Sequence, residues 1–147
     1  MLLWILLFIR RFVYVPNKLK KILVVDDEAG ILSAVCRVAG RSGYTCHSLS
    51  APGEVIPFLN REPCDLMMLD IVMPEVTGFD ILAMLRTDPD LRFVPVIIVS
   101  GNADPDTKLK ALQMGATDIL AKPVDSSELC IRVRNALTIK AYQDRLT

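Results

Sequence analysis

Histidine is nearly absent from this chain, because His47 is the only one among 147 residues. A histidine-based metal site or a catalytic triad therefore lacks the partners that it needs, and we expect His47 to be a half-buried strand residue. No C-x-x-C pair and no zinc-like spacing is present among the four cysteines, Cys36, Cys46, Cys64 and Cys130. We expect reduced, mostly buried thiols and a cytoplasmic protein.

Excess charge is also absent, since 17 lysines and arginines balance 17 aspartates and glutamates. This balance argues against nucleic-acid binding driven by overall charge. A hydrophobic content of 52% argues against disorder, and 147 residues give room for one domain with a proper core. We expect a single globular domain that does not bind nucleic acid directly.

No apolar run reaches the length of about 20 residues that a transmembrane helix needs. Met1–Ile9 is apolar, Arg10 and Arg11 interrupt it, and Phe12–Val15 resumes the pattern. Positive charge does not precede this run and no small-residue cleavage site follows it, so a secretory signal is not indicated. We expect residues 1–19 to be a flexible extension or the product of a start codon assigned too early. Contact of residues 1–15 with a membrane is a less favoured alternative.

Short aliphatic runs alternate with helical patterns from Lys20 onwards. This alternation predicts an α/β fold, a doubly wound parallel sheet of five strands and five helices with right-handed crossovers. Capping residues mark three helix starts, namely Thr77 with Asp80, Asp104 before Pro105, and Asp125 with Glu128. The expected strands cover residues 21–25, 44–49, 65–69, 94–99 and 117–121, and the expected helices cover residues 28–41, 52–60, 78–86, 105–114 and 126–143.

Five polar residues stand just past the apolar runs of four expected strands. They are Asp26, Asp27, Asp70, Ser100 and Lys122. Because ligands of open α/β sheets bind beyond the carboxyl ends of the strands, these side chains should converge on one site. Each residue taken singly is more simply a cap, a turn or a surface residue. Together they predict a site that binds Mg²⁺, which prefers carboxylates, waters and phosphate oxygens, and that handles a phosphoryl group.

Asp70 is the candidate nucleophile toward phosphorus. It stands alone on the central strand, whereas Asp26 and Asp27 are adjacent and suited to hold the metal ion. The ammonium of Lys122 would stabilise negative charge on the phosphoryl oxygens. Pro123 follows this lysine, and a cis bond there would redirect the loop and determine where the lysine points.

With these motifs the sequence resembles the receiver domain of bacterial response regulators over residues 20–143. The resemblance implies a flavodoxin-like fold with strand order 2-1-3-4-5 and a phosphorylation switch. A sensor histidine kinase or a histidine phosphotransfer protein would be the donor of the phosphoryl group to Asp70. The matching segments are Ile22–Glu28, Asp70–Pro74 with Gly78, Val99–Gly101, and Gly115–Asp118 leading to Lys122 and Pro123.

The same resemblance implies further roles at the site. Asp26, Asp27 and Asp70 would hold Mg²⁺ together with the backbone carbonyl of Val72. Ser100 and Lys122 would bind the phosphoryl oxygens and relay the change, and Pro123 would position the loop.

One position departs from the family pattern. Three residues before the lysine the family usually has Tyr or Phe, whose ring turns inward on activation, and here the switch position is Ile119. The phosphorylation chemistry should survive, but the usual readout through the face of the fourth helix, fifth strand and fifth helix is in question. Val72 and Asn102 occupy positions where the family tunes the lifetime of the phosphoryl group.

The resulting interpretation is a single-domain response regulator that switches the binding of a downstream protein and catalyses only its own phosphoryl transfer and hydrolysis. Residues 1–19 would be an apolar extension, residues 20–143 the receiver and residues 144–147 a tail. Dimerisation through the last helix stays open.

Three alternatives remain. Residues 132–146 resemble the linker that leads into cyclic-di-GMP enzymes in some family members, so the chain could be the receiver part of a multidomain regulator. An aspartyl-phosphate phosphohydrolase is disfavoured, because Val72 stands where such enzymes commonly have a second acid. A constitutive pseudo-receiver would be favoured only if one of the five polar residues were missing.

Overall fold

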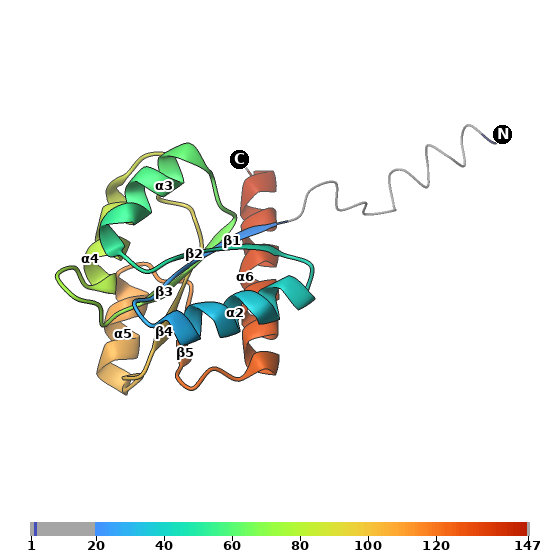
Figure 1. Cartoon of the computed structure of the whole chain (residues 1–147). Coiled ribbons are helices and arrows are strands. Elements are labelled where there is room, and N and C mark those ends of the chain that lie inside the picture. The colour runs from blue at the N-terminus through green and yellow to red at the C-terminus, as the bar shows by residue number, and fades with distance from the viewer. Residues whose placement is uncertain (1, 3–19, 147) are drawn as a thin grey trace.

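The computed structural model of the chain describes residue 2 and residues 20–146 (Figure 1). The expected extension over residues 1–19, and any membrane contact of residues 1–15, lie outside these described residues, Leu2 aside. Within the described part, no helix is long and apolar enough to cross a membrane.

All five strands are parallel and follow the order β2-β1-β3-β4-β5, which confirms the expected sheet. Every residue of β3 and β4 is buried, because helices cover both faces of the sheet. Burial on both faces explains why these strands are continuous aliphatic runs rather than alternating ones. The strands are β1 (Lys21–Val25), β2 (Thr45–Leu49), β3 (Leu66–Asp70), β4 (Val96–Ser100) and β5 (Asp118–Ala121).

The helices divide between the two faces, α2 and α6 on one and α3, α4 and α5 on the other (Figure 1). Alternation along β1 directs Leu23 and Val25 into the cluster under α3–α5 and Ile22 and Val24 into the cluster under α2 and α6. The helices are α2 (Ala29–Arg41), the short 3₁₀ helix η1 (Pro52–Glu54), α3 (Val55–Arg61), α4 (Gly78–Thr87), α5 (Pro105–Gln113) and α6 (Ser126–Leu146).

Local sequence explains where the helices begin. The Thr77 hydroxyl accepts from the Asp80 backbone N–H while the Asp80 carboxylate accepts from the Thr77 N–H, which confirms the capping box. The expected single helix over residues 52–60 is instead η1 followed by α3. A new start at Val55 places Pro57 in the first turn, where its missing N–H has no partner within the helix.

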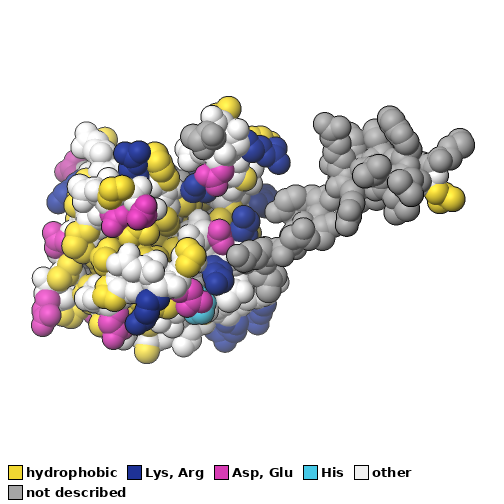
Figure 2. Space-filling model, turned by 90° about the horizontal axis from the view of Figure 1, so that it is seen from above, with side chains coloured by type: hydrophobic (Ala, Val, Ile, Leu, Met, Phe, Trp, Pro, Cys, Tyr) yellow, Lys and Arg dark blue, Asp and Glu magenta, His cyan; other side chains and the backbone are white. Residues whose placement is uncertain are grey.

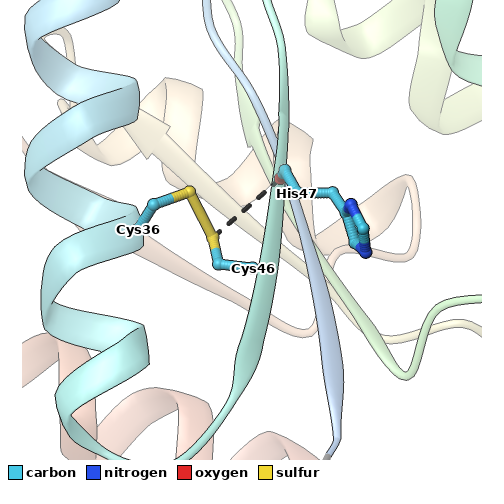
Figure 3. The surroundings of a disulfide bond; sticks show 3 residues. All are labelled: Cys36, Cys46 and His47. Carbon is cyan, nitrogen blue, oxygen red and sulfur yellow. Dashed lines mark hydrogen bonds between the residues drawn. A yellow bond between two sulfur atoms is a disulfide. The ribbon is translucent and has the colours of Figure 1, made fainter.

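The expectation of four reduced thiols is wrong for two of them. Cys36 of α2 and Cys46 of β2 form a disulfide, with Cα atoms 5.4 Å apart (Figure 3). The chain turns back between α2 and β2, so residues ten apart in sequence meet across the sheet edge at a separation that a disulfide spans. Cys64 and Cys130 are free and half-buried, and burial, followed by the charge of Asp65, raises the pKa of Cys64 to about 12.

His47 is half-buried on β2, as expected. Its Nε2 atom lies 3.4 Å from the Glu62 carboxylate, and its ring centroid lies 5.5 Å from that of Phe58. His47 is therefore a structural residue of the edge strand β2, where it contacts Glu62 and Phe58.

Loss of the disulfide should lower the stability of the fold. A cross-link between residues ten apart contributes about 2–3 kcal/mol by restricting the unfolded chain. We expect the double variant Cys36→Ser/Cys46→Ser to lose this amount in urea unfolding, and Cys130→Ser to lose little. In unreduced, denatured protein, alkylation followed by mass spectrometry should modify only Cys64 and Cys130. Four alkylated cysteines in protein prepared without reductant would contradict the link.

Candidate functional site

The carboxyl ends of the central strands meet at one edge of the sheet. Asp26 and Asp27 directly follow β1, and Lys122 directly follows β5. Asp70 and Ser100 are the last residues of β3 and β4, one position earlier relative to the strand end than expected, because both still pair in the ladder. The parallel register thus brings the five predicted side chains to the same edge.

The three carboxylates form one compact cluster. One oxygen from each of Asp26, Asp27 and Asp70 lies within 4.8 Å of the others. Asp26 and Asp70 are only 2% and 4% exposed, whereas Asp27 is open to solvent. Hard oxygen ligands at this spacing, with one side open for waters, suit a divalent cation such as Mg²⁺. The donor set therefore fits the metal that the sequence predicts.

The ammonium of Lys122 bridges the two buried carboxylates. Its Nζ lies 2.8 Å from Asp26 Oδ2 and 3.4 Å from Asp70 Oδ2. Glu28, a contact that sequence reasoning missed, has Oε1 3.5 Å from the same ammonium. Burial disfavours the charge of Lys122, but the hydrogen bond to Asp26 and the surrounding carboxylates outweigh burial and raise its pKa. The lysine is therefore a permanent cation of the site.

The charged form of Asp70 is disfavoured in this arrangement. Burial raises the pKa of its carboxyl, and the charge of Asp26 raises the pKa further. Lys122 and the backbone N–H of Val72 lower the pKa again without cancelling the rise. A bound cation would relieve the same repulsion, which gives a physical reason for metal binding here. The predicted contact of the Val72 carbonyl with the metal stays a prediction.

Ser100 is 1% exposed, and its hydroxyl is engaged within the loop after β4. Ser100 Oγ donates to the Asn102 carbonyl over 3.2 Å and accepts from the Asn102 N–H over 3.1 Å. The hydroxyl thus couples the strand end to the loop that leads into α5.

Ile119 lies outside the acid cluster. It pairs with Ile98 in the sheet register and packs, partly buried, against the core under α3–α5. The peptide bond between Lys122 and Pro123 is cis, as the sequence allows. The switch role of Ile119 and the loop-positioning role of Pro123 stay predictions.

Gly78 sets how closely α4 approaches the end of β3. Its N–H donates to the Ile71 carbonyl over 2.8 Å, and a Cβ at this position would overlap the backbone carbonyl of Asp70. Only glycine lets α4 begin directly against the end of β3.

Comparisons with known proteins identify the family of this chain. A family model for the response regulator receiver domain matches residues 22–134. The chain is 33% identical over 118 residues to the probable transcriptional regulator ycf27 of Porphyridium aerugineum, which covers 80% of this chain and 48% of that relative. It is 32% identical over 126 residues to a probable cyclic di-GMP phosphodiesterase of Vibrio cholerae, which covers 85% of this chain and 28% of that relative. The chain thus spans about half or less of these relatives.

A solved structure is also similar. A response regulator receiver domain protein from Clostridium thermocellum superimposes with a TM-score of 0.77 at 31% sequence identity. The match covers 85% of this chain and 99% of that chain.

Replacing Asp70 by Asn should stabilise the protein in metal-free buffer at neutral pH. The pKa of Asp70 is higher in the folded than in the unfolded chain, so its charge opposes folding above the folded-state pKa. We expect a rise of a few degrees in the unfolding temperature, measured by circular dichroism with EDTA present. The gain should shrink as pH falls through the folded-state pKa of Asp70, because the native carboxyl then takes up its proton.

The exposed neighbour provides the control, since Asp27→Asn should change the unfolding temperature little in the same buffer. Millimolar Mg²⁺ should raise the unfolding temperature of the unaltered chain more than that of Asp70→Asn. A variant Asp70→Asn that is less stable at every pH would contradict the electrostatic account.

Proposed function

The chain belongs to the receiver-domain family of two-component response regulators, and from that membership we propose that it is a phosphorylation-dependent switch with Asp70 as the phosphoacceptor. The observation that carries the proposal is the cluster at the strand ends, where the Lys122 ammonium lies between the carboxylates of Asp26 and Asp70. Such a cluster combines a nucleophile, a cation and a metal-ligand set in one place.

Asp26, Asp27 and Asp70 would hold the metal ion, with the Val72 carbonyl as a further ligand. Mg²⁺ bound there would supply charge neutralisation for the carboxylates and for the phosphoryl oxygens. The compact spacing of the three acids and the raised pKa of Asp70 support this assignment.

In the proposed transfer, a carboxylate oxygen of Asp70 attacks the phosphorus of a phosphohistidine on the donor protein. The new P–O bond forms an acyl phosphate as the P–N bond breaks, and the imidazole leaves with the electron pair of that bond and takes up a proton. Lys122 Nζ, 3.4 Å from Asp70 Oδ2, is near enough to follow the negative charge onto a phosphoryl oxygen. Hydrolysis of the acyl phosphate would restore the free carboxylate.

Ser100 would couple phosphorylation of Asp70 to the loop that leads into α5. Its hydroxyl would exchange the Asn102 carbonyl for a phosphoryl oxygen, and the loop into α5 would move with it. Ile119 packs in the neighbouring core rather than in the acid cluster, so the readout at this position would act by repacking an aliphatic side chain. Pro123 would hold the loop that presents Lys122.

Residues 20–143 form the proposed receiver unit, and a sensor histidine kinase or a histidine phosphotransfer protein is the proposed donor. The output would be the binding of a downstream protein. The need to meet such a donor favours a cytoplasmic location, where the reducing environment would act against the Cys36–Cys46 disulfide. The chain is either a stand-alone switch or the receiver part of a larger regulator, as the greater lengths of the relatives allow. Turnover of phosphate esters is disfavoured, because the exposed Val72 offers no acid or base two residues after Asp70.

Incubation with acetyl phosphate and Mg²⁺ tests the proposal. The full chain should gain one phosphoryl group by intact-mass spectrometry, and the gain should disappear in EDTA and in Asp70→Asn. Equal labelling of Asp70→Asn and the unaltered chain would contradict Asp70 as acceptor. A chain that stays unmodified by acetyl phosphate and by phosphorylated histidine kinases would contradict the switch itself.

Removal of the bridging cation should slow the transfer. We expect Lys122→Gln to lower the rate of labelling by acetyl phosphate by roughly a hundredfold, since one stabiliser of the developing charge is lost. Lys110→Gln is the matched control, because Lys110 lies over the Phe79 ring and away from the acids, and it should label at the unaltered rate. Equal rates for the two variants would show that Lys122 does not act on the phosphoryl group.

A further inference from the structure

A second concave site lies at the other end of the sheet from the acids. Lys20 and Tyr44 directly precede β1 and β2, so they mark the amino ends of the strands. Together with the C-terminal half of α6 they border a cavity of about 450 Å³ that is open to solvent. Figure 2 looks down on the molecule from the side of the C-terminal end of α6, where Lys and Arg side chains lie among Asp and Glu side chains. The volume is within the range of small-molecule sites.

Positive charge alone lines this cavity. Its charged residues are Lys20, Arg134 and Arg145, and its lining within the described part of the chain contains no carboxylate. None of the three forms an ion pair among the described residues, whereas Arg132 on the same helix is 3.0 Å from Asp118. All three residues are exposed to solvent, and their combined charge would attract an anion into the cavity.

The neighbouring cavity on α6 shows that this charge pattern is not general. It measures about 320 Å³ and shares Lys20, Leu137 and Ala141 with the first cavity, but it is also lined by Asp65, Asp90 and Asp144. These acids balance the lysines there, so an anion would gain little. The purely cationic lining is a property of the first cavity.

Two tyrosines and an apolar floor complete the site. Tyr142 is 62% exposed, and the Arg145 guanidinium lies 5.8 Å from its ring centroid. Tyr44 and Leu137 also line the cavity. An exposed aromatic ring beside arginine and lysine can stack a planar base while the cations contact phosphates. A bare phosphate would make no use of the exposed Tyr142 ring, so the lining favours an anion that carries a planar ring.

We propose that this cavity binds a nucleotide, with Lys20, Arg134 and Arg145 holding its phosphates and Tyr142 stacking on its base. A nucleotide there would join the overhanging half of α6 to the amino ends of β1 and β2. The site shares no residue with the acid cluster.

Equilibrium dialysis of the full chain against radiolabelled ATP tests the proposal. EDTA is present throughout, so that metal-bound phosphate at the acid cluster does not contribute. We expect saturable binding of one ATP per chain. Arg134→Gln should weaken binding by about tenfold or more, as the loss of a charge-assisted contact predicts. Arg132→Gln, two residues away and outside the cavity, should bind as the unaltered chain does.

The base is tested separately from the phosphates. Tyr142→Ala should weaken binding of ATP by about tenfold but leave binding of tripolyphosphate unchanged, and Tyr142→Phe should restore the ATP affinity. Asp70→Asn should bind ATP as the unaltered chain does, which keeps this test distinct from the phosphorylation assay. Circular dichroism of each variant verifies that it folds.

Three results would overturn the proposal. The first is the absence of saturable ATP binding at millimolar concentrations in the full chain. The second is equal weakening by Arg132→Gln and Arg134→Gln, which would indicate attraction by general charge. The third is equal affinity of the unaltered chain and Tyr142→Ala for ATP, which would indicate a phosphate contact without recognition of the base.

Discussion

The ion pairs of Lys122 with Asp26 and Asp70 are the constraint on which the site depends. Two carboxylates that are almost fully buried would cost several kcal/mol each without a cation beside them. The two carboxylates lie close together because β1 and β3 are neighbours in the parallel sheet. The Lys122 ammonium reaches them because β5 ends at the same edge of the sheet. Lys122 therefore links the stability of the fold to the chemistry of its open edge.

The ion pairs with Lys122 compensate the buried charge of Asp70 only in part. The pKa of Asp70 stays raised because burial and Asp26 outweigh the lysine. A bound metal ion would relieve the repulsion that Asp70 still experiences, and in the proposed switch the added charge of the acyl phosphate would lie farther out, toward solvent and Lys122. The residues that form the proposed site therefore oppose folding of the metal-free protein slightly, a trade-off that is common at functional sites.

The sheet and the convergence of polar residues at its edge could be predicted from the sequence. Buried parallel strands consist of aliphatic runs, and polar residues mark where these runs end. The sequence predicts that Asp70 and Ser100 follow their strands, whereas both are the last residues of β3 and β4. A polar side chain does not reveal whether its backbone still pairs in the sheet. The Cys36–Cys46 link was missed because it depends on how α2 returns to β2. Arg86, half-buried with hydrogen bonds to the carbonyls of Gly115, Arg92 and Val94, has no sequence signal either.

Chemical trapping of the acyl phosphate tests the central claim most directly. Borohydride reduces an aspartyl phosphate to homoserine, and peptide mass spectrometry then locates the residue. After incubation with acetyl phosphate and Mg²⁺, the account predicts homoserine at position 70 alone. Homoserine at position 26 or 27 would contradict it, because the acids assigned to the metal ion would then be the acceptors. Stable phosphorylation without homoserine would also contradict it, since the phosphoryl group would not be on a carboxylate.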